Sequence, residues 1–371
     1  MVRALATCIL AVTICTSVKA GEVIPFDPEL WEIRAKAHVL EHYRGRDAIY
    51  IHQGTASLKG VAFTNGTIEF DVFLTERQAF PGVYFRQVEG GNQESFFLRP
   101  HLSGKPDANQ AAPSINGLVP WQLYFGETYS FPYDYNYEDW THVKVVVNGS
   151  RAQVYLDYAE KPNLSWNLKH PPRAGGVSIG GGFAPMHYAG FTIDEKAVEL
   201  VDFAVEEPEP VPGLIQEWSI SGQFDETELE ALASLEKLIS RQRFEHTISV
   251  EENNAANISW VAARRSADGK RLGNTVFARL TIDSKATQTK IFDFGYSDRV
   301  VVILNGRPLY RGNNKWRSRD YRYLGTIGLF DAVYLDLRKG ENTLLLAVSE
   351  DFGGWGVTGR FRDPAGVDVR P

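Results

Sequence analysis

The amino-acid sequence predicts an all-β protein of two β-sandwich domains, joined by a proline- and glutamate-rich linker and one amphipathic helix. Apolar and polar side chains alternate along many short segments, as expected of strands with one buried face. Glycine and proline are frequent, with 33 and 18 residues among 371, and aromatic residues make up 12% of the chain. That composition favours β-sandwiches over helical bundles.

The first 20 residues have the pattern of a cleaved secretory signal peptide. Arg3 is followed by an apolar run over 5–15, and Val18-Lys-Ala20 is a small-residue cleavage site. The run is too short for a stable bilayer anchor, and no later stretch reaches the length that a membrane span needs. We therefore expect cleavage near Ala20, secretion to the extracellular space or the periplasm, and no insertion into a membrane.

Charge and cysteine content exclude several classes of function. Without Arg3 and Lys19, the 39 basic residues become 37 against 46 acidic ones, so the formal net charge changes from −7 to −9. Such an acidic chain is not expected to bind nucleic acid or anionic membranes. Both cysteines, Cys8 and Cys15, lie in the leader. Its cleavage therefore excludes disulfides, thiolate catalysis and cysteine–metal sites.

The first domain is expected over 21–204, where almost every segment has the pattern of a strand or a turn. Residues 66–74 alternate between apolar and polar side chains. Residues 139–157 predict a β-hairpin that turns at Asn148-Gly149. Residues 103–138 form a long insertion rich in proline, asparagine and aromatic residues, and its length favours a binding loop over a plain connection.

A linker and a helix are expected over 205–246, followed by the second domain over 247–371. Prolines alternate with other residues over 206–212, which favours a stiff and solvated linker. Asp225 is a suitable N-cap, and leucines at helical spacing follow it. We therefore expect one amphipathic helix over 226–243.

Both domains resemble known β-sandwich families. The first, with Asn65-Gly-Thr-Ile-Glu-Phe-Asp71 and a hairpin ending Val154-Tyr-Leu-Asp157, is similar to the concanavalin A-like lectin/glucanase superfamily, including laminin-G-like (LamG) modules. The second resembles galactose-binding-like jelly rolls through Val301-Val-Ile-Leu-Asn-Gly-Arg-Pro-Leu309, Leu337-Arg-Lys-Gly-Glu-Asn-Thr-Leu344 and Phe352-Gly-Gly-Trp-Gly356. The resemblance implies sandwich folds, but both families include lectins, accessory modules and enzymes. Both often bind structural calcium, although no acidic loop here has convincing ligand spacing, and no other cofactor is expected.

One face of three predicted strands carries side chains suited to a polar, ring-shaped ligand. Aromatic faces stack on the C–H side of sugar rings, while arginine and histidine donate hydrogen bonds to hydroxyl or carboxylate groups. The expected ligand contacts are Tyr84, Arg86, Phe97, Arg99 and His101, joined by Trp121 and Tyr124 from the long insertion. Two arginines and a histidine favour an acidic sugar or a sulfated chain. The alternatives are a solvated sheet face with arginine stems packed over the rings, or a surface covered by the second domain.

Glu69 and Asp71 are candidates for an acid pair, because laminarinase-type glucanases place three acids on one strand. Here the third position holds Phe73 or Leu74. The strand therefore lacks the partner that retaining hydrolysis needs at about 5 Å. If the protein is an enzyme, a glycosidase or a polysaccharide lyase, the candidate catalytic residues are Glu69, Asp71, His101 and Tyr84.

Two further strings match catalytic motifs in their letters only. His38-Val-Leu-Glu-His42 has the spacing of a zinc-peptidase helix, but on the expected strand its histidines would lie about 13 Å apart. Gly176-Val-Ser-Ile-Gly180 matches a nucleophile elbow, but the residues after it cannot begin the helix that this elbow requires. No metal site is therefore expected.

The second domain contains an aromatic and basic set, formed by residues 314–323 and Trp355. This set indicates either a second sugar site or the seam between the domains.

As a whole, the sequence predicts a secreted protein that binds a polysaccharide or glycan on the concave sheet face of its first domain, and it identifies no protein partner. The alternatives are a glycoside hydrolase or polysaccharide lyase of the same fold, and a structural or adhesion module without a glycan site.

Overall fold

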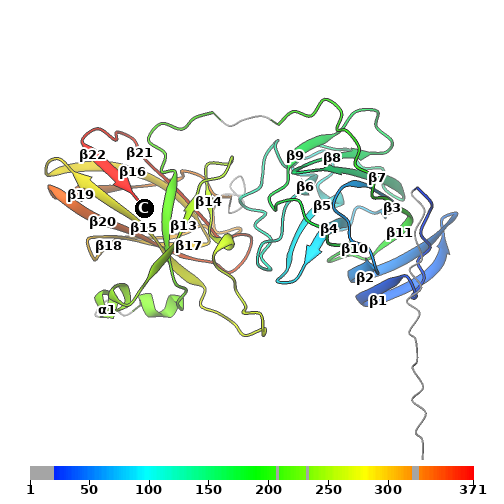
Figure 1. Ribbon diagram of the computed structural model, residues 1–371, viewed down its shortest axis with the longest axis horizontal. Helices are drawn as coiled ribbons and strands as arrows, with labels where there is room; N and C mark the ends of the chain where they lie inside the picture. The colour runs from blue at the N-terminus through cyan, green and yellow to red at the C-terminus, as the bar shows by residue number, and fades with distance from the viewer. Residues whose placement is uncertain (1–20, 206–208, 231–233, 320–325) are drawn as a thin grey trace, which may run out of the picture.

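The structure is a computed structural model that describes residues 21–205, 209–230, 234–319 and 326–371. The predicted signal peptide, 1–20, lies outside these residues, as do 206–208 of the predicted linker. Two β-rich bodies lie side by side, and the chain crosses from one to the other along one edge (Figure 1). Almost all of the regular structure is strand, which confirms the predicted all-β fold class.

The first sandwich is one antiparallel sheet of 11 strands that encloses a single apolar core. Its strand order is β6-β5-β4-β10-β2-β11-β3-β7-β8-β9, with β1 paired to β2. The strands span Trp31–Tyr43 (β1), Arg46–Leu58 (β2), Gly66–Leu74 (β3), Gly82–Val88 (β4), Asn92–Leu98 (β5), Asn109–Ala111 (β6), Asp139–Asn148 (β7), Arg151–Leu156 (β8), Leu164–Asn167 (β9), Gly176–Gly181 (β10) and Met186–Asp194 (β11). A 3₁₀ turn, Pro100–Leu102, follows β5.

Strand β2 joins the two layers of this sandwich. Its first half pairs with β11 over 48–51, and its second half pairs with β10 over 54–57. At the change of partner, Gln53 has a φ of 50°. A Cβ atom on Gly54 would lie 2.1 Å from the carbonyl oxygen of Arg34 in β1, an approach that only glycine tolerates. This irregular backbone lets one sheet cover both sides of the core.

The alternation predicted for 66–74 is confirmed in β3. Ile68, Phe70, Val72 and Leu74 are at most 1% exposed and belong to the core of the first sandwich. Because successive side chains of a strand point to opposite faces, the polar residues between them lie on the outer face of the sheet.

The second sandwich has a seven-stranded and a four-stranded antiparallel sheet around a second core. The sheet orders are β13-β12-β15-β20-β17-β18, with β22 on β15, and β14-β21-β16-β19. The strands span Glu217–Ser221 (β12), Phe244–Ser249 (β13), Ala256–Asn257 (β14), Thr275–Ser284 (β15), Gln288–Ser297 (β16), Arg299–Leu304 (β17), Arg307–Asn313 (β18), Asp331–Leu337 (β19), Gly340–Ser349 (β20), Gly356–Phe361 (β21) and Val367–Arg370 (β22), with a 3₁₀ helix at Ile258–Trp260. Strand β12 lies within the segment in which the sequence predicts only a linker and a helix. Trp355 is fully buried in this core and therefore does not belong to a surface site.

The helix predicted over 226–243 is wrong in length. The structure has a 3₁₀ helix, Glu226–Leu229, and one short α-helix, Leu235–Ser240 (α1). Arg241 pairs with Glu228, 13 positions earlier, whereas a continuous helix would separate the two residues by about 20 Å. Tertiary contacts thus fold the segment back, while its leucines still pack on the second sandwich. Among the residues that the structure describes, no helix has the length and apolar character needed to cross a bilayer.

Candidate functional site

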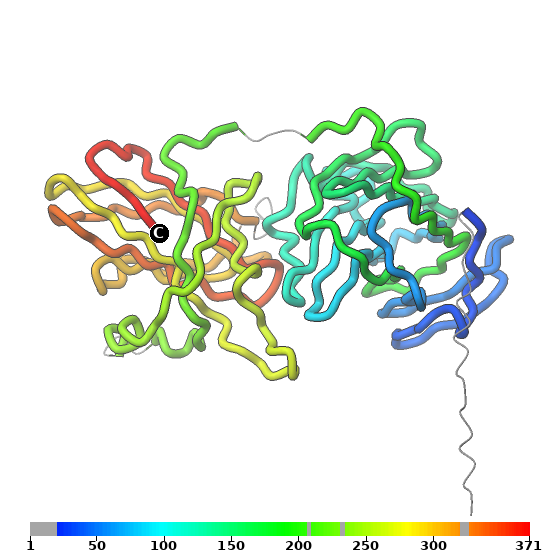
Figure 2. The backbone as a smooth tube through the Cα atoms, in the orientation of Figure 1, coloured from blue at the N-terminus to red at the C-terminus, as the bar shows by residue number. Residues whose placement is uncertain are grey.

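A cleft of about 960 Å³ lies between the two sandwiches. One wall comes from β4, β5, the 3₁₀ turn after β5 and the loop after β6, and the other comes from loops of the second sandwich. The loop after β6 lies beside the second sandwich (Figure 2). Five of the seven predicted ligand contacts line the cleft: Tyr84, Phe97, Arg99, His101 and Trp121. The fold therefore brings together most of the side chains that the strand pattern assigns to one face.

Aromatic rings from both sandwiches meet in the cleft. Trp121 of the first sandwich lies against Phe352, with ring centroids 6.0 Å apart, and Phe352 lies 6.1 Å from Trp316. Phe352 is 57% exposed and Trp316 is 40% exposed. These rings form a contiguous apolar surface in a concave site, which is a feature of ligand-binding grooves.

Arg99 is held between rings on the first wall of the cleft. It is only 8% exposed, and its guanidinium group lies 5.3 Å from the ring centroid of Phe97 and 6.0 Å from that of Trp121. It donates to the side chain of Gln110 and lies 3.5 Å from a carboxylate oxygen of Asp107. Because arginine stays charged when it is buried, the cleft has a pre-oriented positive group behind its aromatic lining.

His101 lies on the same wall, next to Phe80. The two ring centroids are 5.2 Å apart, and Phe80 also contacts Phe97 at 6.1 Å and Phe183 at 5.3 Å. Burial lowers the pKa of His101, so its ring is neutral at neutral pH. One ring nitrogen bonds to the backbone of Ala79, and Nδ1 is buried with no partner among the described residues. The sequence pattern does not single out Phe80 and Phe183, because both lie outside the regular strands.

Arg86 lies outside the cleft, although strand alternation predicts it there. Its side chain is fully buried and donates to the carbonyl oxygen of Thr64 at 2.6 and 2.9 Å and to that of Gly149 at 2.6 Å. The pairing of β4 with β5 changes register between Phe85 and Val88, and Arg86 has a φ of 53°. This bulge turns Arg86 away from the cleft, so its side chain ties together loops of the first sandwich.

Tyr124 also lies outside the cleft, in the contact between the sandwiches. Its hydroxyl donates to Glu251 at 2.7 Å, and the hydroxyl of Tyr129 donates to Glu252 at 2.6 Å. Lys169 forms an ion pair with the same Glu252. The two tyrosines belong to a buried cluster drawn from both sandwiches. The walls of the cleft are therefore fixed relative to each other without a ligand.

Glu350 is a fully buried carboxyl group in the second wall of the cleft. Its Oε1 accepts a hydrogen bond from the backbone of Gly354 at 3.2 Å, and no donor in the described part of the chain reaches Oε2. Burial, together with the nearby Asp298, raises the pKa of Glu350 to about 8. This carboxyl therefore keeps its proton at neutral pH. The sequence does not reveal it, because Glu350 follows β20 outside any motif.

Basic residues of the second sandwich also line the cleft: Arg264, Arg265, Arg271 and Arg317. The first three lie on one loop, in which Arg265 and Arg271 form an isolated β-bridge. Arg317 and the neighbouring Trp316 belong to the predicted set over 314–323, of which 320–323 lie outside the described residues. The seam between the domains and the candidate sugar site therefore involve the same loop.

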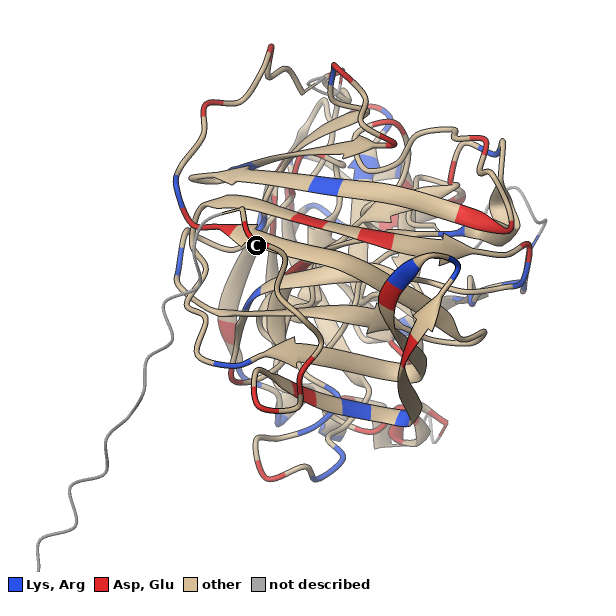
Figure 3. Ribbon diagram, turned by 90° about the vertical axis from the view of Figure 1, so that its right-hand side faces the viewer, with Lys and Arg blue, Asp and Glu red and all other residues tan. Residues whose placement is uncertain are grey.

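Glu69 and Asp71 lie on β3 in a charged network on the outer face of the first sandwich. His142 bonds through Nδ1 to Asp71 at 3.0 Å and through Nε2 to Glu69 at 3.1 Å, and Arg46 pairs with the other oxygen of Asp71. Burial alone would lower the pKa of His142, but the two carboxylates raise it to about 9. Acidic and basic positions occur on neighbouring strands of this face (Figure 3). Both candidate acids thus have partners, and neither lines the cleft.

The two motif matches lie on strands. His38 and His42 are on β1, and Ser178 is on β10 with its side chain buried. A strand provides neither the helix of a zinc peptidase nor the turn of a nucleophile elbow. Among the described residues, no group of three or more His, Cys, Asp or Glu is placed to hold a metal ion.

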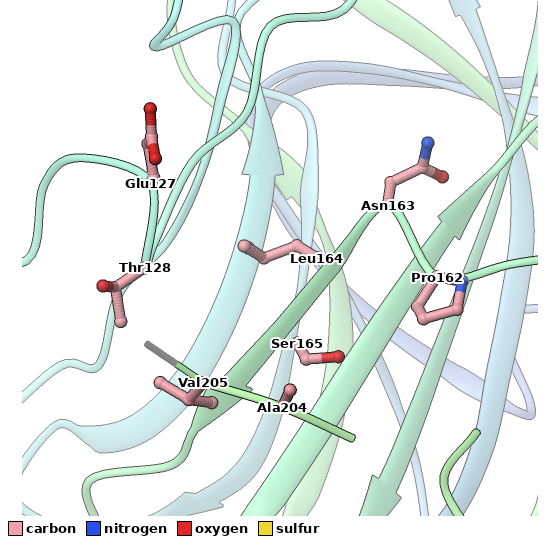
Figure 4. Close-up of a pocket in the computed structure, with 8 residues that line it drawn as sticks. All are labelled: Glu127, Thr128, Pro162, Asn163, Leu164, Ser165, Ala204 and Val205. Atoms are coloured by element: carbon pink, nitrogen blue, oxygen red, sulfur yellow. The ribbon is translucent and has the colours of Figure 1, made fainter. Parts of the chain in front are cut away.

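A smaller cavity of about 200 Å³ lies beside β9 (Figure 4). It is lined by Glu127, Thr128, Pro162, Asn163, Leu164, Ser165, Ala204 and Val205. This lining contains one charged side chain and no aromatic ring, so it lacks the aromatic rings and the arginines of the cleft.

Comparisons with known proteins give no family for this chain. No family model matches it, and no curated protein matches its sequence. Its fold has weak similarity to a putative glycosyl hydrolase from Parabacteroides distasonis (11% identity, 45% of this chain and 89% of that one, TM-score 0.32), to the carbohydrate-binding module CBM66 from Bacillus subtilis (14%, 44% and 94%, 0.35) and to galectin LEC-6 from Caenorhabditis elegans (12%, 42% and 95%, 0.29). Similarities of this size carry no inference about function, which has to rest on the cleft itself. The resemblance to laminin-G-like and galactose-binding-like modules stays a prediction.

Proposed function

We propose that the protein is secreted and binds a polysaccharide or glycan in the cleft between its two sandwiches. The observation that carries this proposal is the lining, in which Trp121 of the first sandwich meets Phe352 and Trp316 of the second. The volume of about 960 Å³ is at the upper end of the range of about 300–1,000 Å³ that is typical of ligand pockets. Buried contacts between the sandwiches support a preformed site.

The lining suits the two kinds of surface on a sugar ring. Apolar C–H faces stack on aromatic rings, and hydroxyl or carboxylate groups accept hydrogen bonds from charged and neutral donors. Tyr84 and Arg99 supply such donors on the wall that also carries Phe97. Because Arg99 is already held between rings, binding does not have to order its side chain, which reduces the entropic cost.

The acids of the cleft favour binding over cleavage. Glycoside hydrolysis uses two carboxyl groups, about 5 Å apart in retaining enzymes and about 6.5–9.5 Å apart in inverting ones. Of the carboxylates that line the cleft, Asp107 pairs with Arg99, and Asp351 pairs with Arg299 and Lys315. The cations beside Asp351 lower its pKa, which makes this carboxylate a weak general base.

A glycoside hydrolase or polysaccharide lyase is the second candidate function, and Glu350 is the observation that favours it. A carboxyl group in the lining whose pKa is raised to about 8 has the protonation state that a general acid needs at neutral pH. If the protein cleaves its ligand in this way, Glu350→Gln lowers kcat by about 100-fold or more while the ligand still binds. Mass spectrometry of glycans incubated with each form separates this enzyme from a binding protein.

A glycan array probed with residues 21–371, with and without calcium, tests the proposal first. Saturable binding without new products in mass spectrometry supports it. Cleavage of a bound glycan instead supports the second candidate, and silence across the array supports a structural or adhesion module. Secretion is tested separately, because the exported protein should begin at Gly21.

Trp121→Ala should lower the affinity for an array hit about tenfold or more, because it removes the ring that meets the aromatic residues of the second sandwich. Isothermal titration calorimetry measures the change, and thermal unfolding checks that the variant folds. The matched control is Trp140→Ala, which removes a tryptophan of β7 on the outer face and should leave the affinity unchanged. If only the Trp140→Ala control loses binding, the ligand binds on the outer face and the cleft is not the binding site.

A further inference from the structure

The charged side chains that line the cleft are more basic than acidic. The basic ones are Arg99, Arg264, Arg265, Arg271 and Arg317, and the acidic ones are Asp107, Glu350 and Asp351. The whole chain has the opposite balance, with a formal net charge of −7. The cleft therefore differs in sign from the rest of the molecule, and low-dielectric walls concentrate the field of such a site.

Each acid of the lining is neutralised by the protein itself. Asp107 lies 3.5 Å from Arg99, and Asp351 lies 2.7 Å from Arg299 and 2.8 Å from Lys315. Burial opposes ionisation of Asp351, but these two cations hold its pKa well below the usual range. Glu350 is neutral because it is protonated and not because it is paired, since burial raises its pKa to about 8.

Four of the five arginines have no such neutralising partner. In the described part of the chain, no carboxylate lies within ion-pair distance of Arg264, Arg265, Arg271 or Arg317. Arg265 donates to the carbonyl oxygen of Gly269 at 2.8 Å, and Arg317 lies 4.1 Å from the ring centroid of Trp316. These contacts orient the guanidinium groups but leave their charge available to a ligand.

The loop that carries Arg264, Arg265 and Arg271 belongs to the second sandwich and lines the wall of the cleft opposite the first sandwich. The acid and the base nearest its tip, Asp268 and Lys270, pair with each other at 3.0 Å, so they do not neutralise the arginines. A ligand whose rings stack on Trp121 and Phe352 thus lies in a cleft whose second wall supplies Arg264 and Arg317. Guanidinium groups are well suited to this position, because they bind carboxylate and sulfate oxygens in pairs and also stack on rings.

We propose that the cleft selects an acidic glycan, one whose sugar units carry carboxylate or sulfate groups, and that the second sandwich recognises this negative charge. This inference rests on the proposed glycan binding and adds the class of ligand to it. It also assigns the second sandwich a part of the site, in place of a purely accessory role.

Two matched pairs of ligands test the charge requirement. One pair is polygalacturonate fragments and the same fragments fully methyl-esterified, and the other is dextran sulfate and dextran of equal length. At low ionic strength, the acidic member of at least one pair should bind about tenfold or more tightly than its neutral partner, and the difference should shrink as salt is added. The pair that shows the difference identifies the anionic group.

Variants then place the charge recognition in the cleft. Arg264→Gln combined with Arg317→Gln should remove most of the preference for the acidic ligand. The matched control, Arg307→Gln with Lys339→Gln, removes the same charge from exposed positions outside the cleft and should keep the preference. Equal loss in both double variants would mean that a general surface field acts, and it would overturn the inference.

The possible failures of the inference and of the proposed function differ. If neutral glycans bind in the cleft as well as or better than acidic ones, the acidic-glycan inference is wrong while glycan binding stands. If no array glycan and no member of either pair binds, the proposed function is wrong as well. Thermal unfolding of each double variant shows that a lost preference does not come from misfolding.

Discussion

Arg86→Met should lower the free energy of unfolding by about 3–5 kcal/mol without changing the glycan affinity of the protein that stays folded. The substitution removes three hydrogen bonds to the carbonyl oxygens of Thr64 and Gly149, two half-buried residues. It also removes a positive charge near the buried Glu94. The Nε and Nη2 groups of Arg86 bond to backbone carbonyls, Nη1 is buried without a partner in the described part of the chain, and the side chain does not line the cleft.

Urea unfolding measures the loss of stability, and calorimetric titration of an array hit measures the affinity. Arg77→Met, at an exposed position, is the control for loss of one arginine and should change stability by less than about 0.5 kcal/mol. A stable Arg86→Met protein with reduced affinity would contradict this role and make Arg86 a ligand contact, as the strand pattern predicts.

His142→Phe should lower the free energy of unfolding by about 2 kcal/mol at pH 6, and the difference from the natural protein should shrink as the pH rises. In the folded protein the charged ring donates one N–H to Asp71 and the other to Glu69. These two contacts raise the pKa of His142 from 6.5 to about 9. A raised pKa contributes stability that is complete below about pH 6.5 and is lost as the pH passes through about 9. Water weakens the effect, since the Glu69 side chain is 34% exposed.

Chemical denaturation at several pH values between 6 and 10 tests this dependence. His246→Phe, on the exposed side of β13, is the control and should show a small change that does not vary with pH. Phenylalanine can still stack on Tyr158, whose centroid lies 4.0 Å from that of His142, so a loss that stays constant with pH would indicate that the ring stabilises through its hydrogen bonds and that its charge is unimportant.

The parts of the fold that could be predicted from the sequence are those specified by local pattern. Alternation in β3 predicts which side chains are buried, because the period of a strand is two residues. The hairpin predicted over 139–157 is confirmed as β7 and β8, which pair from Val143 opposite Leu156 to Asn148 opposite Arg151. The two turn residues are Gly149 and Ser150, one position later than the predicted Asn148-Gly149, and a two-residue turn determines the register of the strands that it joins.

The parts that could not be predicted depend on irregular backbone or on contacts between the sandwiches. The bulge in β4 moves Arg86 out of the face that alternation assigns to it, and a single sequence gives no signal of that bulge. The hydroxyl of Tyr124 donates a hydrogen bond to Glu251, which lies 127 positions away in the chain. Arg264 and Glu350 become cleft residues only because the second sandwich packs against the first.

The contact between the sandwiches has a further consequence for how the protein can be divided. Tyr124 and Tyr129 hold Glu251 and Glu252 through buried groups, so the union of the two halves does not depend on the peptide that connects them. The connection over 206–212 acts mainly by keeping the halves at a high local concentration. Each half carries only one wall of the cleft, so under the proposed function neither half alone should bind the glycan, and binding should report on whether the two halves are assembled.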